Sequence, residues 1–309
     1  MAGSLIAQKN FYVVPGASGN ATSWQKAGDL SAVLLAAQPG DHIHLSEGTY
    51  LPTTSTDRSI SFVVPSGVKL SGGYRLTGGT AERDVLRYRS ILSGAIGDPG
   101  ADDNTYHVVR ITRANNATVL NGLTISHGNA NVEGVAEHGG GLLNDGSNGS
   151  SLPVFHQVTF AHNNAREGGA LYNNGRGGDA SPTLVNCTFR NNTADLDGGA
   201  VFNNGGDGGV AAPEFTGCKF IDNLASYGAA IFIGKGNTSC NFKIKDCEFR
   251  DNNALLWGGA VYAIGAGADC RLELARCRFA NNYPTNINKM RSLTQDIEGE
   301  RVVLADVGK

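Results

Sequence analysis

The amino-acid sequence predicts an all-β fold, a solenoid of the parallel β-helix type, and three observations favour it. Phe recurs five times at spacings of 29, 31, 29 and 30 residues, each time followed three positions later by Asn. A Gly-Gly-Ala or Gly-Ala-Ala phrase falls between successive repeats. The apolar segments of each repeat are short and alternate as strands do, which leaves no room for an amphipathic helix. A stack of coils, one coil per repeat, accounts for both the period and the short strands, and equivalent positions in successive coils then lie about 4.8 Å apart. The recurring residues are Phe160, Phe189, Phe220, Phe249 and Phe279.

The first element expected along the chain is a short helix within residues 22–38 that caps the solenoid. In the segment GDLSAVLLAAQPGD, apolar residues fall on one helical face, Asp29 stands at the N-cap, and Pro39 and Gly40 end the helix. A cap is needed because the first coil would otherwise expose its core and an unpaired strand edge. The apolar face consists of Leu30, Val33, Leu34 and Ala37.

Short strands are expected next, in less regular coils that precede the repeats. The segments predicted as strands are HIHL, SISFVV, VKLSGGY, SILSG, YHVVRI and NGLTISH. Residues 10–285 are therefore assigned to one β-helix domain. The repeat ends after Tyr283 and Pro284, so residues 286–309 are expected to form a C-terminal cap or a linker.

Cys and Asn have predicted structural roles within each repeat. Four of the Phe residues follow a Cys by two positions, which places both side chains on the same strand face. The Asn three positions after Phe should turn a corner in left-handed backbone and bond the Asn above and below. Stacked thiols fit disulfide torsions poorly, so buried free thiols are favoured over disulfides. The ladder is Cys187, Cys218, Cys247 and Cys277, with Cys240 and Cys270 in a second register.

Charge and hydropathy exclude two classes of partner. With 25 Lys and Arg against 28 Asp and Glu, and a net charge of -3, the chain has no basic footprint for nucleic acid. No apolar run approaches the length of a membrane span. The opening segment MAGSLIAQKN lacks the basic and apolar regions of a secretory signal, and we expect that a signal has been removed ahead of it.

Several segments resemble a known superfamily. FYVVPGASGN, AAQPGDHIHLSEGTY and ILSGAIGDPGADDNTYHVV look like the N-terminal coils of secreted bacterial right-handed parallel β-helix proteins, the pectate-lyase-like superfamily. The paired Phe-x-x-Asn and Gly-Gly-Ala phrases are similar to the repeats of polymorphic outer-membrane proteins, which are surface passenger domains and adhesins. The resemblance implies a right-handed β-helix that is secreted or held at the cell surface. It does not fix an activity, because this fold hosts lyases, hydrolases, epimerases and adhesins.

One column of variable residues is the candidate for chemistry. The residue before each Gly-Gly-Ala phrase should stack on its counterpart in the next coil, which places Glu167 and Asp197 about 5 Å apart along the backbone stack. Two carboxylates at that separation could serve as acid and nucleophile in a retaining glycosidase. The competing interpretation, solvated turn residues, is favoured over this one. The column is His138, Glu167, Asp197, Tyr227 and Trp257.

Two arginines flank the same loops. Arg166 and Arg176 could neutralise the carboxylate of a uronate, as polysaccharide lyase chemistry requires. The alternative is that both are solvated loop residues.

A second column is aromatic and follows the aliphatic residue of each Gly-Gly-Ala phrase. Alternation places one of these columns inside and the other outside. The aliphatic column is the more uniform and suits the core, so the aromatic rings should face outward as a platform for sugar rings. Burial of the rings under adjoining loops, as a second core, is the alternative. The aromatic column is Tyr172, Phe202, Phe232 and Tyr262, with Tyr227 and Trp257 on the neighbouring turn.

No cofactor is expected, since no Cys and His spacing suggests zinc. The segment GDPGADDNTYH offers oxygen ligands for calcium but lacks the spacing of a calcium loop, so an ordinary polar turn is preferred. The predicted function is an extracellular protein that binds a polysaccharide or cell-surface glycan. A polysaccharide lyase or glycoside hydrolase is one alternative, and a non-catalytic adhesin or structural passenger domain is the other. The candidate calcium ligands are Asp98, Asp102, Asp103 and Asn104.

Overall fold

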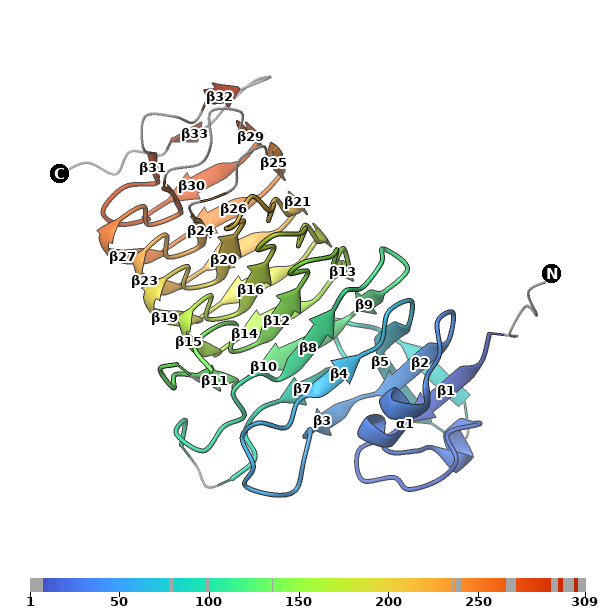
Figure 1. Ribbon diagram of the computed structural model, residues 1–309. Coiled ribbons are helices and arrows are strands. Elements are labelled where there is room, and N and C mark those ends of the chain that lie inside the picture. Colours follow the sequence, from blue (N-terminus) through green and yellow to red (C-terminus); the bar gives the residue numbers. More distant parts are fainter. Residues whose placement is uncertain are drawn as a thin grey trace, which may run out of the picture.

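The chain winds into a stack of coils, and the predicted all-β parallel β-helix is confirmed. The early strand β1 and the late strand β32 lie at opposite ends of the stack (Figure 1). Strands from successive coils pair in parallel and build four sheets along the stack, here called sheets A to D. The computed structural model describes residues 8–77, 80–97, 100–134, 136–234, 236, 241–264, 271–289, 294–296 and 303–304.

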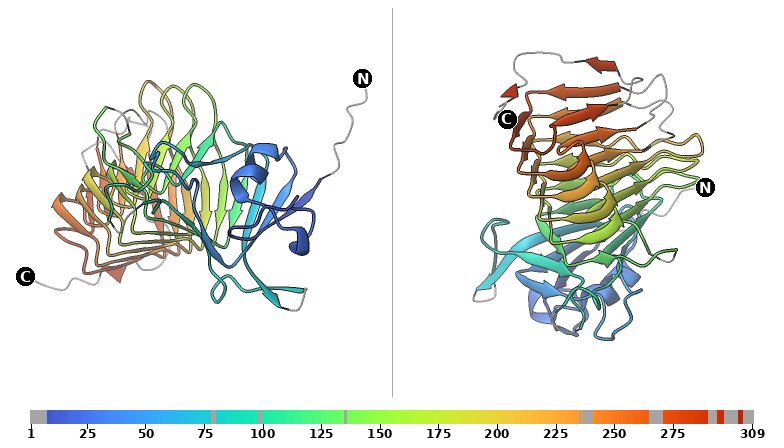
Figure 2. Two further views of the ribbon diagram at one scale, coloured as in Figure 1. Left: turned by 90° about the horizontal axis from the view of Figure 1, so that it is seen from below. Right: turned by 90° about the vertical axis from the view of Figure 1, so that its left-hand side faces the viewer.

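Sheet A runs along the whole stack, and its buried inward residues are mainly Leu, Ile and Phe. Its strand order is β1-β2-β5-β9-β13-β17-β21-β25-β29-β32, and β6 pairs antiparallel with β5. The β5–β6 hairpin projects from the stack (Figure 2). The strands are β1 (Asn10–Val13), β2 (His42–Ser46), β5 (Lys69–Thr77), β6 (Thr80–Arg83), β9 (Val119–Asn121), β13 (Val154–His156), β17 (Thr183–Val185), β21 (Glu214–Thr216), β25 (Asn241–Lys245), β29 (Arg271–Ala275) and β32 (Thr294–Asp296).

Sheet B carries the recurring Phe residues, which point into the core as a stack of rings. Phe189 and Phe220, for example, have ring centroids 4.9 Å apart and planes 2° apart. Both are fully buried. In spatial order, the strands are β3 (Gly48–Tyr50), β7 (Ser90–Ser93), β10 (Leu123–Ser126), β14 (Thr159–Ala161), β18 (Thr188–Arg190), β22 (Lys219–Ile221), β26 (Glu248–Arg250), β30 (Arg278–Ala280) and β33 (Val303–Leu304).

Sheets C and D lie on either side of the Gly-Gly-Ala phrases, with sheet D before each phrase and sheet C after it. Sheet D has small inward residues, such as Ala194 and Ala225. Its strands are β11 (Asn129–Ala130), β15 (Asn164–Glu167), β19 (Thr193–Asp197), β23 (Leu224–Tyr227) and β27 (Asn253–Trp257). Sheet C contains β4 (Phe62–Val64), β8 (Val109–Thr112), β12 (Leu142–Asp145), β16 (Leu171–Asn174), β20 (Val201–Asn204), β24 (Ile231–Ile233), β28 (Val261–Ala263) and β31 (Ile287–Lys289).

The N-terminal end of the stack is closed by α1 (Leu30–Ala36), preceded by the 3-10 turn η1 (Trp24–Lys26). Asp29 accepts a hydrogen bond from the Ala32 backbone nitrogen at 2.9 Å, as an N-cap residue does. The helix buries Leu30, Val33 and Leu34, and it packs on β1 and β4. The predicted capping helix is therefore present. No helix among the described residues combines the length and the hydropathy that a membrane crossing requires.

The Asn of each repeat forms the predicted ladder, but the expected backbone conformation was wrong. Asn192 is buried, and its side-chain nitrogen donates to Asn223 Oδ1 at 3.0 Å and to the Phe160 carbonyl at 3.1 Å. The left-handed residue is its predecessor, Asn191, with φ of 53°. The exposed Asn191 makes the turn, and this change of chain direction points the Asn192 side chain into the core. The equivalent left-handed residues are His162, Asp222, Asp251 and Asn281.

The four cysteines of the main ladder are buried and free, in agreement with the preferred interpretation. Cys240 and Cys270 lie outside the described residues. The described parts of residues 286–309 add one strand each to sheets A, B and C. Whether that segment serves as a cap or a linker stays a prediction.

Candidate functional site

Five side chains from successive coils stand in one column along sheet D. His138 pairs with Glu167 in parallel register, and Glu167 pairs in turn with Asp197. The same register continues through Tyr227 to Trp257. These residues hold their places because a Gly follows each of them at the turn toward sheet C. At Gly168, with φ of +65°, an added Cβ would lie 2.7 Å from the Leu171 carbonyl oxygen.

The two carboxyls of this column are both hard to ionise. Burial raises the pKa of Glu167 to about 7, and the nearby carboxylates of Asp197 and Glu137 add to the effect. Burial also raises the pKa of Asp197 to about 6. A carboxyl that holds its proton near neutral pH can act as a general acid.

His138 closes the N-terminal end of the column. Its Nδ1 lies 3.4 Å from Glu167 Oε2, but that nitrogen makes no hydrogen bond. The contact therefore lacks the alignment of a proton-transfer pair. Burial lowers the pKa of His138 against an opposing effect of Glu137, so the imidazole is mainly neutral at pH 7.

Both arginines that were expected to receive a uronate are already paired. Arg166 lies 2.8 Å from Glu133 Oε1 and 3.9 Å from Glu137 Oε2. Arg176 lies 2.7 Å from Asp207 Oδ2, on a loop beyond β16. A guanidinium paired in this way has less to offer to a substrate carboxylate. Sequence reasoning overlooked Glu133 and Glu137 because they belong to an irregular loop before the first regular coil.

The aromatic column is buried, so the expectation of an outward sugar platform was wrong. Tyr172, Phe202, Phe232 and Tyr262 are only 3%, 7%, 4% and 8% exposed. The rings stack with centroids 5.0, 4.8 and 5.6 Å apart. They do point away from the main core, as alternation predicts. The Gly turn then folds sheet D side chains over them, and His138 and Tyr227 lie on Tyr172 and Tyr262.

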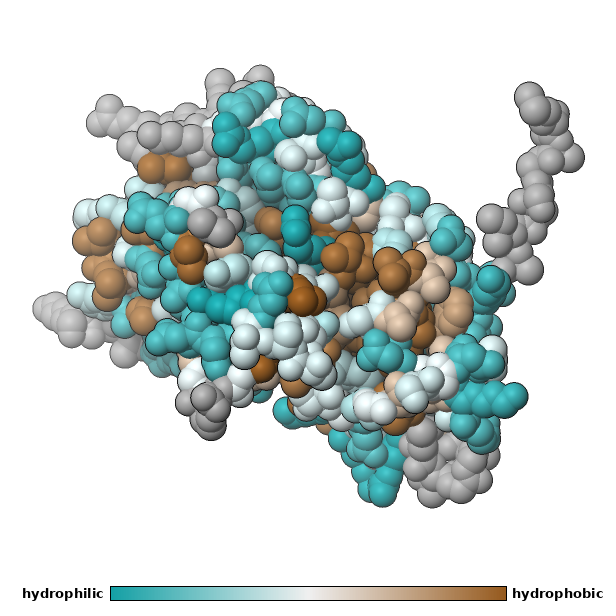
Figure 3. All heavy atoms as spheres, turned by 60° about the horizontal axis from the view of Figure 1, so that its bottom comes forward, coloured by the Kyte–Doolittle hydropathy of each residue, from teal (hydrophilic) through white to brown (hydrophobic). Residues whose placement is uncertain are grey.

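The aromatic surface that stays open lies at the C-terminal end of the same column. Trp257 is 50% exposed, and Tyr227 is partly exposed. Leu255 and Leu256, on the same strand, are 66% and 49% exposed. Apolar groups are visible on the side of the molecule where β23 and β27 lie (Figure 3). Sequence reasoning did not select the two leucines, although Leu255 in ALLWGG stands where ADLDGG has Asp195.

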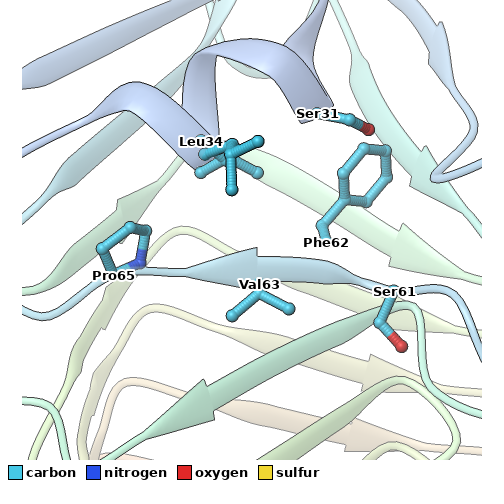
Figure 4. A pocket seen from close by; sticks show the side chains of 7 residues that line it. Ser31, Leu34, Ser61, Phe62, Val63 and Pro65 are labelled. Atoms are coloured by element: carbon cyan, nitrogen blue, oxygen red, sulfur yellow. The ribbon is translucent and has the colours of Figure 1, made fainter.

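A separate hollow of about 340 Å³ lies beside the N-terminal cap, between α1 and β4 (Figure 4). Leu34 and Leu35 line it from the helix, and Phe62, Val63 and Pro65 line it from the strand side. No ionisable side chain lines it. Its strand β4 is at one end of sheet C, and β8 and β12 lie between it and β16, the strand that follows Glu167. The hollow therefore contributes no chemistry to the candidate site.

The candidate calcium ligands do not converge on a described metal site. Asp98 lies outside the described residues, and Asp102 is exposed. Asp103 Oδ1 and Asn104 Oδ1 are buried without a hydrogen-bond partner. Within the described ranges, no three His, Cys, Asp or Glu side chains gather in a geometry that could hold a metal ion.

Comparison with known proteins supports the fold and one of its repeats. The family model of the Chlamydia polymorphic membrane protein repeat matches residues 186–204. The crystal structure of pectate lyase Pel9A is similar, with a TM-score of 0.50 and 14% sequence identity, over 95% of this chain and 80% of that chain. No curated protein sequence matches. The chain therefore has a right-handed β-helix fold like that of this pectate lyase, and residues 186–204 are similar to the polymorphic membrane protein repeat.

Proposed function

We propose that the protein is a secreted or cell-surface β-helix that binds polysaccharide along the sheet D column. The observation that carries this proposal is the continuity of Glu167 and Asp197 with the half-exposed ring of Trp257 in one register. An extended glycan can lie along such a column. One sugar ring would stack on the indole, and the hydroxyls of sugars farther along the glycan would lie near the carboxyls. The similarity to a pectate lyase fold and to a surface-protein repeat supports this class of ligand and this location.

Retention of the protein on an array of plant, algal and host polysaccharides tests the proposal. Trp257→Ala should reduce retention on the bound glycan about two- to tenfold, since one stacked ring contributes about 0.5–1.5 kcal/mol beyond its area burial. Leu35→Ala is the matched control, because Leu35 is 90% exposed and lies on the N-terminal cap. Equal retention of both variants, or no retention of the unmodified protein on any glycan, would reject the column as a binding surface.

A second candidate function is glycoside hydrolysis with retention of configuration. The raised pKa of Glu167 suits a general acid, and Asp197 stands one coil away as a nucleophile. Retaining enzymes place these carboxyls about 5–5.5 Å apart, close to the spacing between coils. Lyase chemistry is less well supported, because Arg166 and Arg176 are paired with carboxylates. Reducing ends released from a bound glycan, and lost in both Glu167→Gln and Asp197→Asn, would support hydrolysis. Release unchanged in either variant would refute it.

A further inference from the structure

A second group of aromatic side chains lies on the outer face of sheet A, at the N-terminal end of the stack. β1, β2 and β5 are adjacent there, and Tyr12 pairs in register with His44. The rings are in mutual contact, with centroids between 4.0 and 5.4 Å apart. All are half-buried, so they keep part of their surface open. We call this the N-terminal ring cluster: Tyr12, Trp24, His42, His44 and Tyr74.

Hydrogen bonds hold the imidazole rings in place. His44 contacts the Tyr74 hydroxyl at 3.1 Å through Nδ1 and Asn10 Oδ1 at 3.0 Å through Nε2. His42 Nε2 lies 2.8 Å from Ser71 Oγ. A set of rings fixed in this way loses little conformational entropy when a ligand stacks on it.

The fixed charges beside the ring cluster are positive. Lys69 pairs in register with His42, and Arg83 reaches over the Tyr74 ring at 5.6 Å. Arg83 donates to the Gly72 carbonyl and to Asn121 Oδ1, which are both neutral. Over the described part of the chain, neither cation pairs with a carboxylate. Burial, together with Lys69 and Arg83, lowers the pKa of His42. Burial, together with His42 and Arg83, lowers the pKa of His44 to about 4. Both imidazoles are therefore mainly neutral at pH 7.

Later strands of the same sheet show what an ordinary outer face looks like in this protein. The register column that contains Lys69 continues through Val119, Val154 and Thr183 to Glu214 and Lys243. Lys243 forms an ion pair with Glu214, and Lys245 lies 3.0 Å from Glu273. Lys243 and Lys245 are therefore neutralised by carboxylates on the two adjacent coils. The unpaired cations and the rings occur together only where β1, β2 and β5 meet, as far as the structure describes sheet A.

We propose that the N-terminal ring cluster binds an anionic saccharide that carries a carboxylate or a sulfate. The apolar face of the sugar stacks on Trp24 and Tyr12, and Lys69 and Arg83 hold the anionic group. Charge complementarity selects this occupant over a neutral glycan, because neither cation has an anion to balance it. The site lies on a different sheet from the Trp257 column and does not depend on the function proposed there.

Titration of the full chain with defined oligosaccharides tests this inference. The probes are an oligouronate, a sulfated oligosaccharide and a neutral oligosaccharide of the same length, followed by calorimetry at low and high salt. Binding of either anionic probe, weakened by salt and absent for the neutral one, is the expected result, and the two anionic probes identify the preferred group. Lys69→Glu should raise the Kd about tenfold or more through charge reversal at an exposed position.

Matched variants separate this site from the other one. Lys243→Glu makes the same charge change on the same sheet face and should leave the Kd within about twofold, because its cation is already paired. Trp24→Ala should weaken binding. If that variant does not fold, Lys69→Glu still tests the site, because Lys69 is exposed. Trp257→Ala should leave binding of the anionic probe unchanged. Equal loss in Lys69→Glu and Lys243→Glu, equal binding of the neutral probe, or loss only in Trp257→Ala would overturn the proposal.

Discussion

His138 stacks face to face on Tyr172, with ring centroids 4.4 Å apart and planes 7° apart. The two residues belong to different columns, so this contact joins the sheet D column to the buried aromatic ladder of sheet C. Tyr172 and Phe202 of this ladder belong to the coils of Glu167 and Asp197, and both carboxyl residues are partly buried. Burial raises the pKa of both carboxyls, and the carboxylates of Asp197 and Glu137 raise that of Glu167 further.

Glu167→Gln should stabilise the protein at pH 8 and change its stability little at pH 4.5. The pKa of Glu167 rises from 4.5 to about 7, so the fold favours the protonated carboxyl. The stabilisation that the protonated Glu167 provides is fully present below the pKa of the unfolded state. It is lost as the pH rises through the pKa of the folded state. Gln keeps the uncharged form at every pH, and the gain at pH 8 should be on the order of 2 kcal/mol. Urea unfolding at both pH values measures it, and equal effects would contradict the raised pKa.

Asn192→Leu should lower the free energy of unfolding by about 3 kcal/mol or more. The substitution leaves the Phe160 carbonyl, the Asn163 amide and Asn223 Oδ1 without their buried partner. Asn191→Gly is the matched control at the left-handed position and should stay within about 1 kcal/mol of the unmodified protein. Chemical denaturation of both variants gives the comparison. A larger loss of stability in Asn191→Gly than in Asn192→Leu would contradict this prediction, because it would show that Asn191 has the larger structural role.

Phe232→Ala should destabilise the protein by about 3–5 kcal/mol, as expected for a buried ring. Its side chain is packed between the rings of Phe202 and Tyr262. Trp257→Ala should cost far less stability, because half of that side chain is already in water. Thermal and urea unfolding of the two variants measure the contrast. A stability loss below about 1 kcal/mol for Phe232→Ala would place the aromatic ladder at the surface after all.

The ladder cysteines should resist alkylation in the folded protein. Cys187, Cys218, Cys247 and Cys277 are fully buried or nearly so. Burial raises the pKa of Cys218, and the hydrogen bond with Cys218, followed by burial, raises the pKa of Cys247. A buried thiol with a raised pKa supplies almost no thiolate at pH 8. Iodoacetamide labelling, read at each cysteine by mass spectrometry, should occur only after unfolding. Rapid labelling of Cys218 in the native protein would show that the coil opens locally.

The period of the sequence was sufficient to predict the coils and their register. The spacing of Phe189 and Phe220 implied that equivalent residues stack, and the pairing of Glu167 with Asp197 follows from the same alignment. Alternation also placed Tyr172 on the side away from the main core, but it could not show what covers that side. The cover depends on the angle that Gly168 sets between two sheets, which is a three-dimensional property.

Other errors had equally local causes. The left-handed residue was assigned to Asn192 instead of Asn191, because both are Asn and either tolerates that backbone. The pairing of Arg166 with Glu133 depends on an irregular loop that has no counterpart in other repeats. The N-terminal ring cluster combines residues from η1 and three separate strands, and no spacing in the sequence joins them.

The in-register stacking of coils also sets the length of the molecule. A whole repeat, such as residues 187–217, could be removed or duplicated without breaking a ladder, since each residue would meet an equivalent neighbour. Each such step would move the ring cluster on β2 and Trp257 on β27 about 4.8 Å closer together or farther apart. The number of coils therefore sets the distance between the two ends of the solenoid. That distance can change in fixed increments while the residues at each end keep their neighbours.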